Sequence, residues 1–321
     1  MENIKHQSVV VNGINMHVAE VGEGPAVLLL HGFPELWYSW RHQMLYLASK
    51  GYRAIAPDLR GYGDSDAPPG PSSYMAFHVV GDLVALLNSL GLDKVFLVGH
   101  DWGSLIAWHL CLFRPDRIKA LVNMSCVYHY FDPKNPSKKP LEEMRETFGD
   151  DYYVCRFQQA TGEVEEEFAG VDTAELVKAF FSNRDTRPPC IPRGGFQYFA
   201  HQNPNPLPEW LTQEDLNYYA TKFKKTGFSG GFNFYRCIDL NWELSAPWRE
   251  AQIQVPVKFV VGDLDLTYHI PGIQDYIHNG GFKKDVPDLQ EVIVIPGAAH
   301  FINQEKADEC SIHIYDFISK F

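Results

Sequence analysis

Short apolar runs alternate with longer amphipathic segments in the first and last parts of the chain. The apolar runs predict buried strands at residues 26–30, 52–57, 95–98, 118–124, 257–262 and 292–295. Residues 79–90, 105–110 and 306–320 have the composition and spacing of helices. Strands that alternate with helices pair in parallel through crossover connections. An Asn12-Gly13 turn before these segments predicts an antiparallel hairpin as well. Together the patterns predict an α/β fold with a mostly parallel sheet flanked by helices.

The pattern changes between residues 131 and 245. A proline-containing linker is followed by acidic, aromatic and helix-forming residues, with few of the apolar runs that mark buried strands. We therefore expect residues 131–245 to form an inserted helical cap, and residues 1–130 and 246–321 to form one α/β core. A length of 321 residues fits this arrangement.

One predicted strand is followed by Gly99-His100-Asp101-Trp102-Gly103 and then by a helical segment. A strand, a Gly-x-nucleophile-x-Gly turn and a helix form the nucleophile elbow of the α/β-hydrolase fold. Glycines flank the nucleophile because side chains two positions away would collide with the following helix. A carboxylate can attack a saturated carbon that carries a leaving group, and the resulting ester can be hydrolysed at the carbonyl of the aspartate. The sequence therefore predicts covalent catalysis by Asp101.

The candidate partners of this nucleophile follow the last two predicted strands. Asp265 comes shortly after the first of them, and His300 comes shortly after the second. Nucleophile, acid and histidine thus occur in the chain order of α/β-hydrolase triads, at the carboxyl ends of parallel strands. We expect His300 to deprotonate water and Asp265 to orient the imidazole and stabilise its charged form. Asp263 is a less favoured candidate for the acid.

The segment His31-Gly32-Phe33-Pro34 follows the first predicted strand of the core. In α/β-hydrolases this loop supplies one N–H group to the oxyanion hole, and the residue after the nucleophile supplies the other. We expect the backbone amides of Phe33 and Trp102 to stabilise the oxyanion that forms when water attacks the ester. His31, Pro34 and Trp102 are the candidate substrate-binding residues, and the Phe33–Pro34 peptide bond can be cis.

The leaving group decides which further residues are needed. A departing alkoxide is strongly basic and needs a proton, whereas a halide needs only weak N–H donors. Tyrosine has an ordinary pKa of roughly 10, so it stays protonated at neutral pH and can donate to a forming alkoxide. Composition does not choose among the tyrosines of the predicted cap, which include Tyr152, Tyr153, Tyr198, Tyr218, Tyr219 and Tyr235.

Over essentially its full length, the chain resembles the plant-type soluble epoxide hydrolases. The matching stretches are residues 31–41, 57–64, 100–103, 153–157, 233–236, 268–272, 276–287 and 298–301. The resemblance implies an enzyme that converts hydrophobic epoxides, such as fatty-acid or aryl epoxides, and water into vicinal diols through an ester on Asp101. It also implies that Tyr153 and Tyr235 grip the epoxide oxygen and that Asp265 is the charge-relay acid.

Two alternative functions stay open. A haloalkane or haloacid dehalogenase is the nearest alternative enzyme, because the haloalkane type uses an aspartate nucleophile on the same fold. Phe33 argues against it, since dehalogenases of that type resemble His-Gly-Asn-Pro in this loop, with an asparagine amide for the halide. A non-catalytic ligand receptor on the hydrolase fold is the alternative of another class. Such receptors often have a disabled triad, whereas every catalytic residue is present in this chain.

Composition narrows the possible partners. The chain has 28 Lys and Arg against 40 Asp and Glu, and its net charge of −12 argues against binding of nucleic acid or of an acidic membrane surface. No apolar run approaches membrane-spanning length, and the cysteines are scattered without a Cys-x-x-Cys pair. No motif implies a metal or an organic cofactor. We expect a cytoplasmic enzyme, a monomer or homodimer, whose partners are a small hydrophobic epoxide and water.

Overall fold

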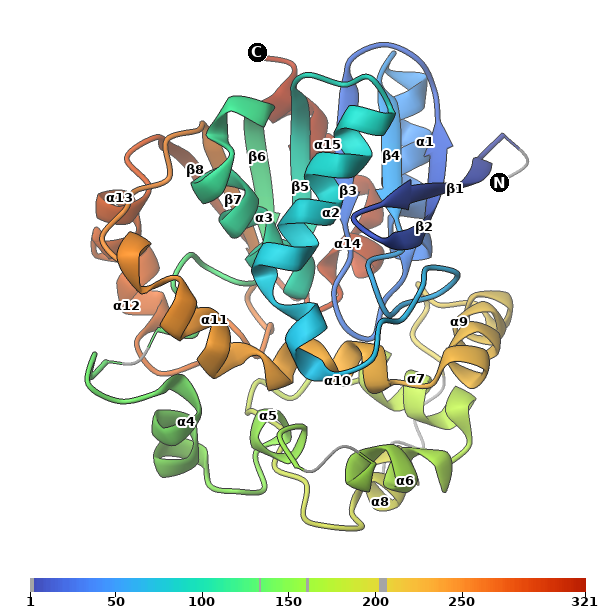
Figure 1. Ribbon diagram of the computed structural model, residues 1–321, viewed down its shortest axis with the longest axis vertical. Helices are drawn as coiled ribbons and strands as arrows, with labels where there is room; N and C mark the ends of the chain where they lie inside the picture. The colour runs from blue at the N-terminus through green and yellow to red at the C-terminus, as the bar shows by residue number, and fades with distance from the viewer. Residues whose placement is uncertain (1–2, 133, 160–161, 202–206) are drawn as a thin grey trace.

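The computed structural model describes residues 3–132, 134–159, 162–201 and 207–321. Its centre is an eight-stranded sheet in the order β1-β2-β4-β3-β5-β6-β7-β8 (Figure 1). β2 pairs antiparallel with both β1 and β4, and all other neighbouring strands pair in parallel. The strands are β1 (Lys5–Val11), β2 (Ile14–Val21), β3 (Ala26–Leu30), β4 (Arg53–Pro57), β5 (Val95–His100), β6 (Ile118–Met124), β7 (Val257–Gly262) and β8 (Leu289–Ile295). The predicted α/β fold with a mostly parallel sheet is therefore confirmed.

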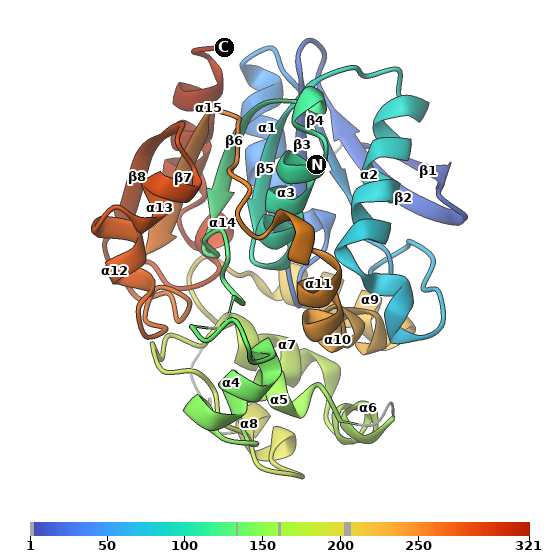
Figure 2. The same ribbon diagram turned by 60° about the vertical axis from the view of Figure 1, so that its left-hand side comes forward.

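Helices cover both faces of this sheet. α1 and α15 pack against each other on one face, and α2 and α3 pack against each other on the other (Figures 1 and 2). Burial on both faces explains why every residue of β3, β5 and β7 is buried, instead of every second one. The helices of this part are α1 (Arg41–Ser49), α2 (Ala76–Ser89), α3 (Trp102–Phe113), α12 (Ile273–His278), α13 (Gly281–Asp285), α14 (Ile302–Glu305) and α15 (Ala307–Ile318).

A second group of helices lies between β6 and β7 in the chain and beyond one end of the sheet in space (Figure 1). These helices are α4 (Pro140–Phe148), α5 (Tyr153–Arg156), α6 (Glu163–Ala169), α7 (Thr173–Phe181), α8 (Phe196–His201), α9 (Gln213–Thr226), α10 (Ser229–Arg236) and α11 (Ile238–Leu244). Short 3-10 helices occur at Trp37–Trp40, Pro71–Tyr74, Pro115–Arg117 and Ala246–Trp248. The second group occupies the segment predicted as a cap, whose boundaries at residues 131 and 245 stay a prediction.

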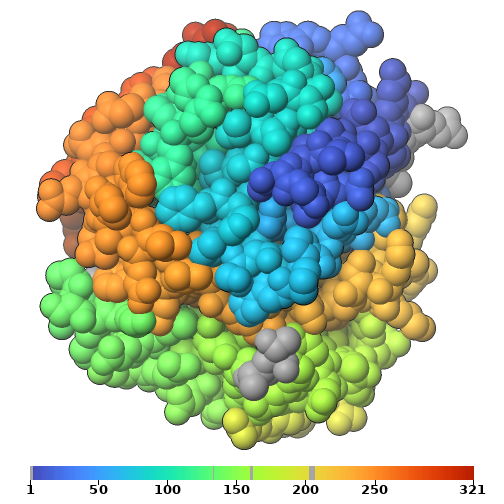
Figure 3. Space-filling model, viewed as in Figure 1, coloured from blue at the N-terminus to red at the C-terminus, as the bar shows by residue number. Residues whose placement is uncertain are grey.

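Apolar side chains from the sheet and from both groups of helices form one continuous core. It includes Val98 of β5, Ile106 of α3 and Phe234 of α10, each at most 1% exposed. The space-filling view shows the second group of helices packed closely against the rest of the molecule (Figure 3). In the described part of the chain, no helix combines the length and the apolar character needed to cross a membrane.

Candidate active site

Asp101 lies in the sharp turn between β5 and α3. Its backbone has φ 52° and ψ −122°, a conformation that non-glycine residues rarely adopt and that persists only where the surrounding structure enforces it. A Cβ atom on Gly99 would lie 2.8 Å from the Cα of Ser104 in α3, and one on Gly103 would lie 2.1 Å from the carbonyl oxygen of Leu30. Both positions therefore require glycine, and the turn has the geometry of the predicted elbow.

His300 lies between two carboxylates. Its Nε2 is 3.4 Å from Oδ2 of Asp101, and its Nδ1 is 2.9 Å from Oδ1 of Asp265. Asp265 is fully buried, and it accepts hydrogen bonds from Ser125 Oγ at 2.5 Å and from the Thr267 N–H at 2.9 Å. The structure thus brings the predicted nucleophile, histidine and acid together in one chain of contacts.

Asp263, the alternative acid, has a different partner. Its Oδ1 accepts a hydrogen bond from the N–H of Gly297 at 2.6 Å, which connects the loop after β7 with the loop after β8. The carboxylate that contacts the imidazole of His300 is that of Asp265, two positions further along the chain.

Burial and charge act in opposite directions at the histidine. Burial disfavours the imidazolium, but the carboxylates of Asp265 and Asp101 outweigh it and raise the pKa of His300 well above its ordinary value. Burial also disfavours the ionised form of Asp265, but the imidazole and two hydrogen bonds lower the pKa of Asp265 to about 2. The acid is therefore ionised at neutral pH, and the pKa of His300 depends on whether Asp101 carries its charge.

The loop after β3 contacts the nucleophile directly. The Phe33 N–H donates a hydrogen bond to Oδ1 of Asp101 at 2.7 Å, and the Phe33–Pro34 peptide bond is cis. A Cβ atom on Gly32 would lie 2.3 Å from the same carboxylate oxygen, so the close approach of the loop requires glycine there. Of the two predicted amide donors, Phe33 makes this hydrogen bond in the described structure. Trp102 begins α3, and its part in the oxyanion hole stays a prediction.

Two tyrosines from the second group of helices share a cavity with the nucleophile. Tyr153 begins α5 and Tyr235 lies near the end of α10, and their ring centroids are 5.9 Å apart. Together with Asp101 and His300 they line a cavity of about 50 Å³. Burial raises the pKa of both phenols well above the ordinary value, and neighbouring phenols and the Asp101 carboxylate add to the rise. Both tyrosines therefore stay neutral hydrogen-bond donors at neutral pH.

Mostly apolar side chains complete the wall of this cavity. The further lining residues are Phe33, Pro34, Phe180, Asn183, Pro189, Ile191, Phe199, Leu266 and Phe301. The members between residues 180 and 199 were not predicted as site residues, because an apolar side chain that faces a cavity has the same sequence pattern as one that faces the core. Such a wall suits a hydrophobic substrate.

Pro34 lies in the wall of the cavity, but the other two candidate substrate-binding side chains lie outside it. His31 is fully buried. Its Nε2 accepts a hydrogen bond from the Leu59 N–H at 3.0 Å, and its Nδ1 donates one to the carbonyl oxygen of Gly32 at 2.9 Å. The indole ring of Trp102 packs edge-on against Tyr235, with centroids 5.0 Å apart, and lines a neighbouring cavity. The positions of His31 and Trp102 therefore favour supporting roles over direct substrate contact.

A buried ion pair beside the nucleophile has no signature in the sequence. Oε2 of Glu35 lies 2.7 Å from Nδ1 of His100, and both side chains are fully buried. The same carboxylate accepts the Gly32 N–H at 2.9 Å, and Nε2 of His100 lies 2.7 Å from the carbonyl oxygen of His300. Burial opposes both charges, but the contact lowers the pKa of Glu35 to about 2 and raises that of His100. The pair thus connects the loop after β3, the elbow and the histidine loop.

Glu35→Gln should lower the free energy of unfolding by about 3–5 kcal/mol near neutral pH, because the buried His100 would lose the carboxylate that stabilises its imidazolium, and would have to stay charged without a partner or give up a proton. The pKa of Glu35 is lowered from 4.5 to about 2 by folding, so its contribution is complete above pH 4.5 and is lost as pH falls toward 2. Urea unfolding at several pH values should show the difference from the wild type shrinking below about pH 4.5. As a control, Glu146→Gln, in an exposed ion pair with Lys138, should unfold like the wild type. Equal losses in the two variants would contradict the prediction.

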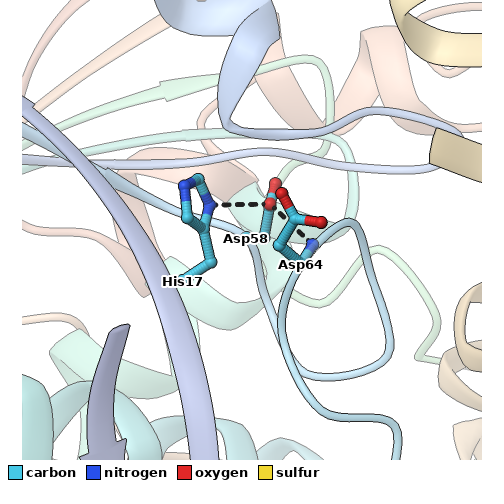
Figure 4. Close-up of side chains that lie close together, drawn as sticks. All are labelled: His17, Asp58 and Asp64. Atoms are coloured by element: carbon cyan, nitrogen blue, oxygen red, sulfur yellow. Dashed lines mark hydrogen bonds and ion pairs between the residues drawn. The ribbon is translucent and has the colours of Figure 1, made fainter. Parts of the chain in front are cut away.

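A second cluster of titratable side chains lies outside the cavity (Figure 4). Nδ1 of His17 in β2 is 2.8 Å from Oδ2 of Asp58, and the carboxylate of Asp58 also accepts the N–H groups of Trp37 at 3.0 Å and Asp64 at 3.1 Å. Asp64 forms an ion pair with Lys222 of α9. Through these contacts the two carboxylates of the cluster connect β2, the loop after β4 and α9.

Comparisons with known proteins agree with this geometry. A family model described as alpha/beta hydrolase fold matches residues 25–307. "Epoxide hydrolase 1" of Siraitia grosvenorii is 64% identical over 321 residues, which is 100% of both chains. The crystal structure of an epoxide hydrolase from Vigna radiata is 55% identical, with a TM-score of 0.92 over 100% of this chain and 99% of that one. A laboratory-evolved variant of potato epoxide hydrolase is 54% identical, with a TM-score of 0.93 over 99% and 100%.

These findings separate the functions that the sequence leaves open. The resemblance to the plant-type enzymes is confirmed, and neither the dehalogenase nor the receptor alternative is supported. The chain belongs to the α/β-hydrolase family, and within it the chain is an epoxide hydrolase of the plant type.

Proposed function

We propose that this enzyme opens hydrophobic epoxides, such as fatty-acid or aryl epoxides, to vicinal diols through an ester on Asp101. A carboxylate oxygen of Asp101 attacks one ring carbon while the bond between that carbon and the epoxide oxygen breaks. Tyr153 and Tyr235 hold the epoxide oxygen and protonate it as it becomes an alkoxide. The observation that carries the proposal is the presence of the carboxylate and both neutral phenols in one largely apolar cavity.

Water then hydrolyses the ester. His300 takes a proton from the water, whose oxygen attacks Cγ of Asp101, and Asp265 stabilises the imidazolium. The Phe33 N–H, already 2.7 Å from Oδ1 of Asp101, stabilises the oxyanion of the tetrahedral intermediate. When the intermediate breaks down, the departing diol oxygen takes the proton from His300, and the remaining proton of the water replaces the one that the phenols gave.

Formation of the ester favours the neutral form of His300, which is the form that can act as a base. In the free enzyme two carboxylates, those of Asp265 and Asp101, raise the pKa of His300. Alkylation removes the charge of Asp101, so one of these causes disappears and the pKa falls. The neutral imidazole that the water step requires is therefore favoured only after the first step has taken place.

We also infer that residues 131–245 act as a cap on a core formed by residues 1–130 and 246–321. They supply both phenols and much of the apolar wall, whereas the core supplies the nucleophile, the histidine and the acid. Every step of the proposed reaction uses side chains and backbone groups, without a metal or an organic cofactor. The cytoplasm stays the predicted location, which the six unpaired cysteines favour, and a monomer or homodimer stays the predicted assembly.

A single turnover in heavy-oxygen water tests the ester. With enzyme in excess over an aryl epoxide, the diol should receive one oxygen from Asp101 and contain no heavy oxygen, while the peptide that contains Asp101 should gain it. This follows because water attacks the carbonyl carbon of the aspartate and not the carbon of the epoxide. Mass spectrometry of the diol and of the digested enzyme measures both. Heavy oxygen in the diol of the first turnover would show direct attack by water and would remove the ester from the mechanism.

A further inference from the structure

The helix that carries Tyr235 has two glycines in its first turn. α10 runs from Ser229 to Arg236, so Gly230 and Gly231 lie in its first turn. Residues four positions apart lie on the same side of a helix, one turn apart. Gly230 therefore shares a side with Phe234, and Gly231 shares a side with Tyr235.

The first turn of α10 lies directly on the backbone of the core. α10 packs against the segment after β4 that includes the 3-10 helix Pro71–Tyr74 (Figures 1 and 2). A Cβ atom on Gly230 would lie 2.1 Å from the carbonyl oxygen of Gly61, and one on Gly61 would lie 2.8 Å from the Cα of Gly230. A Cβ atom on Gly231 would lie 2.6 Å from the ring of Phe33. The contact between Gly230 and Gly61 is backbone against backbone, so no change of side-chain rotamer could relieve an added methyl group.

The second turn places aromatic rings where the glycines allow the helix to approach. The ring of Phe234 packs against those of Tyr62, Tyr74 and Trp102, with centroids 5.5, 5.7 and 5.7 Å away. The ring of Tyr235 packs edge-on against that of Phe33 at 5.6 Å. Small residues in the first turn and large ones in the second thus fix how closely α10 approaches the core.

We propose that Gly230 and Gly231 are positioning residues for the reaction, because the close contact of α10 with Gly61 and Phe33 sets the distance of the Tyr235 hydroxyl from Asp101. The proposal rests on the proposed role of Tyr235 as a proton donor. Ordinary van der Waals contacts of a Cβ atom begin at about 3.4 Å, whereas one on Gly230 would lie 2.1 Å from the carbonyl oxygen of Gly61. A methyl group at residue 230 must therefore move the helix or the loop by roughly 1 Å. A displacement of this size at a reacting group can cost about 100-fold in rate.

Gly230→Ala tests the proposal. Alkylation of Asp101, measured by rapid quenching and mass spectrometry, should slow by about 10- to 100-fold, whereas hydrolysis of the preformed ester should stay within about threefold of wild type. Helix propensity alone would not predict this slowing, because alanine stabilises a helix more than glycine does. Ser229→Ala, one residue earlier and half-buried, is the matched control and should alkylate at the wild-type rate. An unchanged alkylation rate in a folded Gly230→Ala enzyme would overturn the proposal.

A double-mutant cycle separates positioning of Tyr235 from general loosening of the site. If Gly230 acts through the phenol, Gly230→Ala should slow the Tyr235→Phe enzyme by less than about threefold, because the hydroxyl to be positioned is absent. The same change in Tyr153→Phe should keep its full effect. If Tyr235→Phe alone alkylates like the wild type, the proposed donor role of Tyr235 fails. If Tyr235→Phe is slow and Gly230→Ala slows it further by the full factor, only the positioning role fails.

Phe234→Leu provides a second route if the alanine variant does not fold. This substitution leaves the contact between Gly230 and Gly61 intact. It weakens the packing of residue 234, one turn later, against the rings of Tyr62, Tyr74 and Trp102. We expect the same pattern: slower alkylation, little change in ester hydrolysis, and little further effect in the Tyr235→Phe background. Equal slowing with and without the Tyr235 hydroxyl would overturn the proposal here as well.

Discussion

Replacing His300 by glutamine should leave an enzyme that forms the ester once and then stops. Attack by Asp101 on the epoxide needs no base, whereas the attack of water on the ester does. Loss of a general base of this kind costs about 10²- to 10⁴-fold in rate. Intact-protein mass spectrometry after addition of an aryl epoxide should therefore show a stable adduct equal to the mass of the substrate, with little diol released.

His201→Gln is a suitable control for this variant. His201 is exposed at the end of α8 and belongs to none of the contacts that join the triad. It should turn over like the wild type and show no accumulated adduct. A folded His300→Gln enzyme that binds the epoxide but keeps its unmodified mass would show that His300 is not the hydrolytic base, or that it is needed for the first step.

Local sequence patterns were sufficient for the residues whose geometry is fixed by their neighbours in the chain. Asp101 is the clearest case, because the two glycines and the strand–helix junction that allow its backbone conformation lie next to it in the sequence. The sheet was predictable for a related reason, since strands buried on both faces are continuous apolar runs.

Contacts between side chains that lie far apart in the sequence were harder to predict. Asp263 and Asp265 both follow β7, and spacing favours one only weakly. The hydrogen bond from Gly297 to Asp263 and the contact between Asp265 and His300 distinguish them, and both depend on how the loops after β7 and β8 meet. The pair of Glu35 with His100 spans 65 positions in the chain and leaves no periodic signal in either segment.

The catalytic tyrosines of the predicted cap also could not be selected from sequence patterns alone. Nothing in composition distinguishes Tyr153 and Tyr235 from Tyr218 and Tyr219, and the resemblance to a family was needed to choose them. In the structure, Tyr218 accepts a hydrogen bond from the indole of Trp37, and Tyr219 shares one with Ser39, so those two phenols hold α9 against the core. The difference lies in tertiary contacts that a single sequence does not record.

The choice of Tyr153 and Tyr235 leads to the second large effect. Tyr153→Phe and Tyr235→Phe should each slow alkylation by about 100-fold, the usual cost of removing one well-placed donor from a developing oxyanion. The double variant should be nearly inactive toward epoxides, because the alkoxide would then leave without a proton into an apolar cavity. Pre-steady-state measurements separate this step from ester hydrolysis, which should change much less. Tyr198→Phe, at a position 67% exposed on α8, should leave both steps unchanged.

Measuring alkylation and ester hydrolysis separately distinguishes loss of proton donation from loss of packing. Loss of packing would slow both steps, since Asp101, His300 and the phenols share one cavity wall. Loss of proton donation slows only the step in which the epoxide oxygen becomes basic. A double variant that still alkylates Asp101 at the wild-type rate would reduce both tyrosines to packing residues, and the proton for the alkoxide would then have to come from elsewhere in the site. His300 is the remaining candidate in the described wall, because two carboxylates raise its pKa in the free enzyme, and His300→Gln would in that case block the first step as well as the second.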